Sequence, residues 1–139
     1  ITFKGVPTYH DTTRGSERGE NVIFCFTVDD VRLCHLGDLG HMLEAEAASE
    51  IGTVDVLMMP VGGFYTIDAA AATGVMNTLK PRLVIPMHFK TAKCGFPITT
   101  VDDFLLNKTG VKRLNTSEIT LTRESLPSST EIQVLTHAM

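Results

Sequence analysis

Three side chains of the kinds that bind metal ions each follow an apolar run of the chain. His10 closes the segment ITFKGVPTYH, Asp38 closes VRLCHLGD, and His88 closes RLVIPMH. An open α/β sheet binds its ligands outside the carboxyl ends of its strands, so these positions suit a functional site. Zinc, manganese and iron accept imidazole and carboxylate donors in catalytic sites with open coordination positions. Separate structural roles are the alternative, because spacing alone does not bring the three residues together.

Other polar residues near these positions have possible roles in substrate binding or proton transfer. His41 begins a predicted helix beside Asp38, where it could contact substrate or hydrogen-bond a ligand; simple surface exposure explains it equally well. Lys90 and Arg14 could face an anionic group, although interleaved acidic residues leave a solvated loop as the alternative for the arginine. His35 lies three residues before Asp38, so strand alternation predicts opposite sheet faces and a packing role for His35.

Strands and helices alternate around these candidate residues. Two β-rich runs flank the turn-like pair Asp29-Asp30 and predict an antiparallel hairpin that ends near Asp38. Gly62-Gly63 forms either a plain tight turn or an approach for an anion to backbone N–H groups. Thr66 is the expected N-cap of the helix that follows. Further helices are predicted over 41–52, 66–80 and 99–110, and further strands over 54–61, 82–88, 118–122 and 131–138. The alternation predicts an α/β or mixed fold.

Composition sets the class of protein and its compartment. The 139 residues suffice for one domain with a core, and we expect a single domain over 1–139. The formal net charge of −4 and the absence of a basic stripe argue against nucleic acid as a partner. No apolar run is long enough to cross a membrane. Three cysteines without CxxC spacing predict reduced core thiols, so a soluble cytoplasmic protein is expected.

Four segments of the chain carry a family resemblance. TYHD, HLGDLGH, MMPVGGFYT and PMHFKT, in this order, resemble the later motifs of the metallo-β-lactamase superfamily. They are most similar to its branch of metal-dependent hydrolases that includes the ascorbate-6-phosphate lactonases. The resemblance extends from His10 to about Thr91. It implies an αββα sandwich, built from two similar halves with two metals at one edge, in which His10 binds the first metal, Asp38 bridges both and His88 binds the second.

One family motif is missing from the chain. Members of this superfamily carry an earlier His-x-His-x-Asp-His string that supplies the remaining ligands, and no such string occurs here. The resemblance therefore implies a single partial domain, the C-terminal half of a family member. His10 and Asp38 for one ion, with Asp38 and His88 for the other, fall below the three protein ligands of a usual catalytic zinc site. We expect this chain alone to hold little metal and to be inactive.

The resemblance also implies a reaction class. A metal-activated hydroxide would attack an ester, lactone or phosphoester-type small molecule, with Asp38 and His41 as catalytic residues. Zinc is the expected ion, with manganese or iron as alternatives. Arg14 and Lys90 are the expected contacts of an anionic substrate group. A half sandwich leaves apolar surface uncovered, so a homo-oligomer is expected. The competing hypothesis is a non-catalytic α/β module that serves binding or assembly without a complete metal site.

Overall fold

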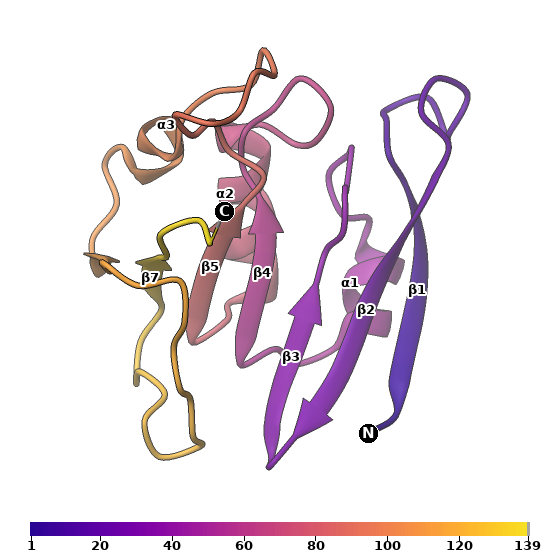
Figure 1. The fold of residues 1–139 in the computed structure, drawn as a ribbon. Coiled ribbons are helices and arrows are strands. Elements are labelled where there is room, and N and C mark those ends of the chain that lie inside the picture. Colours follow the sequence, from indigo (N-terminus) through magenta and orange to yellow (C-terminus); the bar gives the residue numbers. More distant parts are fainter. Residues whose placement is uncertain (139) are drawn as a thin grey trace.

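A seven-stranded mixed sheet forms the framework of residues 1–138, which the computed structural model describes (Figure 1). The strand order is β1-β2-β3-β4-β5-β7-β6. The first three strands pair antiparallel, and the remaining pairs are all parallel. The strands are β1 Phe3–Tyr9, β2 Glu20–Val28, β3 Val31–His35, β4 Val56–Pro60, β5 Leu83–Met87, β6 Val111–Arg113 and β7 Glu131–Val134, and the helices are α1 Ala45–Ile51, α2 Ala69–Leu79 and α3 Val101–Leu105.

The predicted hairpin is confirmed as β2 and β3. Val28 pairs with Val31 across a two-residue turn, and both turn residues have positive φ, 47° at Asp29 and 61° at Asp30. Two left-handed residues in succession define the type I′ turn, whose twist matches that of the flanking strands. Aspartate tolerates this conformation better than most residues, which explains the Asp-Asp pair at this point.

Several predicted boundaries are wrong. Helix α2 is capped by Asp68 rather than Thr66, because the Asp68 carboxylate accepts a hydrogen bond from Ala71 N–H at 2.9 Å. Helix α1 begins only at Ala45, and α3 ends before Leu106. The segment 118–122 is not a strand, and the three-residue strand β6 was not expected.

The two faces of the sheet are covered unequally. In Figure 1, α1 and α2 lie behind the sheet, and the main core fills the space between. A smaller cluster on the other face contains Val31, Val56, Leu83 and Leu126, with Ile119 and Leu121 packed against it. Farther along this face the sheet is open, and Phe3 and Phe24 are 59% and 46% exposed. The predicted α/β class is confirmed, with helices on one face as in half of an αββα sandwich.

A buried carboxylate fastens the start of β4. Asp55 is 1% exposed and accepts hydrogen bonds from Arg32 Nε at 2.8 Å and from Arg123 at 3.0 Å. The Arg32 guanidinium lowers the pKa of Asp55 to about 2, against the opposing effect of burial. Its backbone also bonds to Arg32 and to Leu83, so this one residue ties β3, β4 and β5 together at the amino end of the parallel strands.

No helix within 1–138 is long and apolar enough to span a membrane.

Candidate metal site

The candidate ligands lie at one edge of the sheet. Strand β1 runs in the same direction as β3, β4 and β5, because two antiparallel pairings separate it from β3. His10 directly follows β1, Asp38 lies three residues after β3, and His88 directly follows β5. All three therefore leave the sheet at its carboxyl edge, where α/β sheets bind ligands.

A tight backbone contact holds His10 in place. Gly40 donates its N–H to Tyr9 O at 3.0 Å, and a Cβ at Gly40 would lie 2.2 Å from the carbonyl carbon of His10. Only glycine permits this approach of the loop after β3 to the end of β1. The Nε2 atom of His10 is buried and has no hydrogen-bond partner.

The same construction recurs at His88. Gly62 donates its N–H to His88 O at 3.1 Å, and a Cβ at Gly62 would lie 2.2 Å from that oxygen. His88 itself has a φ of 51°, a strained value for a residue with a side chain. Its Nδ1 atom is buried without a partner. Two buried imidazole nitrogens at the same edge therefore lack a hydrogen-bond partner. A bound cation would supply each nitrogen with one.

Asp38 and His88 line one hollow at this edge. Asp38 is exposed, and its backbone N–H donates to Asn21 Oδ1 at 2.9 Å, which fixes the loop after β3. Glu20, Val22, Phe24 and Met87 belong to the same lining. His10 does not, so the structure brings together two of the three predicted ligands rather than all three. Within residues 1–138, no group of three or more His, Cys, Asp and Glu side chains could hold a metal ion.

His35 lines the same hollow as Asp38, against the prediction of opposite faces. Strand alternation ends at His35, and the chain then turns at Gly37, which has a φ of 61°. His35 Nδ1 accepts a hydrogen bond from Gly37 N–H at 3.0 Å. This contact gives His35 the structural role that the sequence predicted.

His41 has both ring nitrogens engaged within the protein. Nε2 accepts the N–H of Tyr9 at 3.1 Å, and Nδ1–H donates to Met42 O at 2.7 Å. With neither nitrogen free for proton transfer in this arrangement, His41 acts here as a brace between β1 and the loop before α1.

Arg14 shares a hollow with His41, whereas Lys90 lines a different one. The structure thus places neither cation in the lining shared by Asp38 and His88.

Asp11 has a structural role next to His10 that the sequence did not predict. It is 3% exposed, and its carboxylate accepts four backbone N–H bonds, from Thr13, Gly15, Glu17 and Arg18. Burial opposes ionisation, but these donors hold the pKa of Asp11 well below its usual range. The carboxylate therefore folds the loop that follows His10. An aspartate ahead of turn-forming residues was the available signal.

The donor atoms at this edge are of the types that a divalent cation accepts, but they are fewer than a complete metal site needs. The unpartnered nitrogens of His10 and His88 are of the type that zinc, manganese and iron accept, and the exposed Asp38 carboxylate is a hard oxygen donor. A catalytic zinc site usually has three protein ligands. This edge can hold part of a metal's coordination shell, fixed to β1 and β5 by glycine contacts.

Known proteins share the fold of this chain. A Thermotoga maritima protein, described as a candidate Zn-dependent hydrolase of the metallo-beta-lactamase superfamily, superposes with a TM-score of 0.81. It is 38% identical, and the match covers 96% of this chain and 63% of that one. The class of protein is thus a metallo-β-lactamase-type α/β fold. A family model described as the beta-lactamase superfamily domain matches residues 1–88, and the chain belongs to that family.

Relatives that match this chain are named as metal-dependent hydrolases. A UPF0173 metal-dependent hydrolase from Archaeoglobus fulgidus is 33% identical over 109 residues, which are 73% of this chain and 45% of that protein. A UPF0173 metal-dependent hydrolase from Carboxydothermus hydrogenoformans is 32% identical over 110 residues, with the same coverage of each chain. The chain spans less than half the length of these relatives. The predicted superfamily resemblance is confirmed.

Proposed function

We propose that this chain supplies His10, Asp38 and His88 to the metal site of a hydrolase. The observation that carries the proposal is the pair of buried, unpartnered ring nitrogens at one sheet edge, His10 Nε2 and His88 Nδ1. Zinc is the proposed ion, and manganese or iron would accept the same donors. A divalent cation, when bound, acidifies water and polarises the oxygen of a substrate under attack.

Three residues of the chain would act as metal ligands. His10 would hold one metal ion and His88 a second, each through a neutral imidazole, and Asp38 would contribute its exposed carboxylate to both. Gly40 and Gly62 would keep the imidazoles at a fixed separation, because each packs against the backbone of one histidine. The catalytic role expected for His41 is not part of this proposal, since both of its ring nitrogens are in use.

We propose a small-molecule ester, lactone or phosphoester as the substrate class. The hollow that Asp38 and His88 share is the place for the reacting group, and its apolar members Val22, Phe24 and Met87 suit an organic portion. Contacts of Arg14 or Lys90 with an anionic group need a substrate that reaches past this hollow, because both line others. Reduced cysteines in the described residues support a cytoplasmic location.

The test compares this chain with a form lengthened to the size of its relatives. We expect the longer form to hydrolyse esters, lactones or phosphoesters when zinc or manganese is added, and to lose that activity with Asp38→Ala. The His35→Ala variant should keep more activity than Asp38→Ala, because Asp38 would hold the metal whereas the His35 ring hydrogen-bonds Gly37. Equal losses in the two variants, with metal retained by Asp38→Ala, would contradict the bridging role.

A second candidate function has an observation of its own. No three metal-binding side chains come together within 1–138, which favours a non-catalytic binding or assembly module. The open sheet face around Phe3 and Phe24 supports the related proposal that the chain self-associates. A longer form that binds no metal and hydrolyses none of the three substrate types would favour the module over the hydrolase.

A further inference from the structure

Two cysteines face each other across the hairpin. Cys25 on β2 pairs with Cys34 on β3, and their sulfur atoms are 3.8 Å apart. The pairing is three residues from the Val28–Val31 pair that closes the turn. In a two-residue hairpin the closing pair is hydrogen-bonded and the pairs alternate, so Cys25 and Cys34 form a non-hydrogen-bonded pair. At such a pair the Cα atoms are about 4.5 Å apart, within the range that a disulfide can span.

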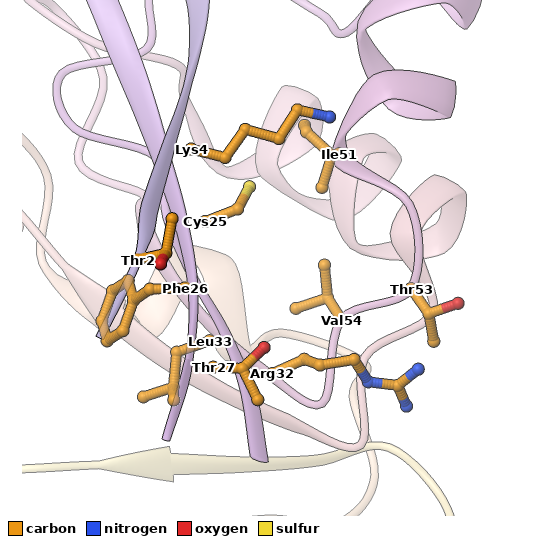
Figure 2. A pocket seen from close by; sticks show the side chains of 10 residues that line it. All are labelled: Thr2, Lys4, Cys25, Phe26, Thr27, Arg32, Leu33, Ile51, Thr53 and Val54. Atoms are coloured by element: carbon orange, nitrogen blue, oxygen red, sulfur yellow. The ribbon is translucent and has the colours of Figure 1, made fainter. Parts of the chain in front are cut away.

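The two thiols differ in access. Cys34 is fully buried in the main core, whereas Cys25 is partly exposed. Figure 2 shows the Cys25 sulfur directed into a hollow, between the side chains of Lys4 and Ile51. The hollow has a volume of about 580 Å³, which is within the range of small-molecule sites. Cys25 lines the hollow and the buried Cys34 does not, so a reagent that enters it meets Cys25 first.

A charged neighbour stands next to Cys25 on its other side. Lys4 on β1 is the register partner of Cys25, so Lys4, Cys25 and Cys34 form one row across three strands. The Lys4 ammonium donates to the backbone oxygen of Glu50 at the end of α1 and lines the hollow. Arg32, another cation of the lining, is committed to Asp55. Lys4 is therefore the cation available to a thiolate at position 25.

We propose that Cys25 and Cys34 form a redox-active dithiol site, in which Cys25, aided by Lys4, reacts with a low-molecular-weight disulfide and Cys34 completes the exchange. This dithiol site is separate from the metal site at the carboxyl edge, because the two hollows have different linings. It changes the role that the sequence suggests for these residues, which is that of inert core thiols. It also predicts a covalent link between β2 and β3 that forms and breaks with the redox state.

The ionisation of Cys25 supports this order of attack. The hydrogen bond from the Cys34 thiol is the main cause that lowers the pKa of Cys25 to about 7, and Lys4 lowers it further. Burial and the Glu50 carboxylate oppose this effect. The same hydrogen bond, with burial, raises the pKa of Cys34. The lowered pKa favours the nucleophilic thiolate at Cys25, and the raised pKa keeps Cys34 as the protonated partner.

The exchange balances in atoms and electrons. The Cys25 thiolate attacks one sulfur of the small disulfide, which forms a mixed disulfide and releases one small thiolate. Cys34 Sγ then attacks Cys25 Sγ, its proton passes to the departing thiolate, and the second small thiol leaves. Two electrons move from the cysteine pair to the reagent. The bond that remains on the protein joins Cys25 to Cys34.

The test uses the whole chain with Cys94→Ser, which leaves Cys25 and Cys34 as its cysteines. Incubation with oxidised glutathione at pH 7 and intact-mass measurement should show the loss of two hydrogens and no lasting adduct. Adding Cys34→Ala should trap one glutathione on Cys25. Adding Cys25→Ala instead should slow the reaction about tenfold or more, because Cys34 is buried. No reaction, a lasting adduct on Cys25 beside intact Cys34, or equal rates without Cys25 would each overturn the proposal.

A charge variant checks the role of Lys4 without touching either sulfur. Lys4→Gln should slow the first step about twofold at pH 7, and the difference should vanish at a pH where Cys25 is fully ionised. Lys80→Gln, at the exposed end of α2, is the matched control and should react like the parent chain. An unchanged rate with Lys4→Gln, or the same slowing with Lys80→Gln, would overturn the role given to Lys4.

Discussion

The buried ring nitrogens of His10 and His88 are costly to the isolated fold. A buried polar atom without a partner costs about 1–3 kcal/mol, since the hydrogen bonds it makes to water in the unfolded chain are lost. His41, in the loop that follows Asp38, has a hydrogen-bond partner for each ring nitrogen. This difference suits His10 and His88 for ligand binding and gives His41 a structural role in holding the loops together.

This contrast predicts opposite effects of the same substitution. His10→Leu should leave the free energy of unfolding unchanged or raise it by up to about 1 kcal/mol, because it removes an unsatisfied nitrogen. His41→Leu should lower it by about 1–2 kcal/mol, because two hydrogen bonds are lost. Urea denaturation at pH 7 gives both values. A loss for His10→Leu as large as that for His41→Leu would mean that the His10 nitrogen has a partner in solution.

At the scale of the elements, the sequence predicted the strands and helices that follow from a local hydrophobic pattern. Strands β4 and β5 come from nearly continuous apolar runs, as expected of parallel strands covered on both sides. Strand β6 has only three residues, two of them exposed cations, and its pairing with β7 depends on long-range packing. The 118–122 segment alternates like a strand, yet Ile119 and Leu121 pack on the sheet face without joining it.

The site was predictable to the same extent. Strand direction places His10, Asp38 and His88 at one edge, and that followed from the apolar runs that precede them. Which of these residues line a common hollow depends on loops, whose course is set by Gly37 and by the carboxylate of Asp11. No periodicity encodes such contacts.

Asp55 links the elements at the opposite edge, and its ionisation should control stability. Its folded pKa of about 2 lies below the ordinary value of 3.8, so the ion pairs stabilise the fold above pH 4 and lose their effect as the pH falls toward 2. Asp55→Asn should therefore cost about 2 kcal/mol at pH 7, by the shift in pKa. The cost should shrink below pH 4.

Urea unfolding of the parent chain and Asp55→Asn at several pH values measures this effect. Asp103→Asn, an exposed carboxylate in α3, is the control and should change little at any pH. A cost for Asp55→Asn that is the same at pH 3 and at pH 7 would show that shape, rather than charge, is what Asp55 contributes.

On the scale of the whole molecule, the open sheet face should drive association. Phe24 lies within this face, on β2, and is 46% exposed, whereas Phe96 is 56% exposed in a loop. Phe24→Lys should shift a dimer or larger assembly toward monomer in light scattering, because a charge there opposes burial. Phe96→Lys should leave the assembly unchanged. A monomeric parent chain at high concentration would contradict the proposed self-association.

The metal site proposed at the carboxyl edge depends on coordination by His10 and by His88. Zinc titration of the ¹⁵N-labelled chain, with detection of the histidine ring nitrogens, tests it without any need for activity or tight binding. We predict that His10 Nε2 and His88 Nδ1 shift on zinc addition, that Asp38→Asn weakens the response, and that the two hydrogen-bonded ring nitrogens of His41 stay unchanged. Shifts confined to His41, or no response at His10 and His88, would contradict metal coordination at this edge.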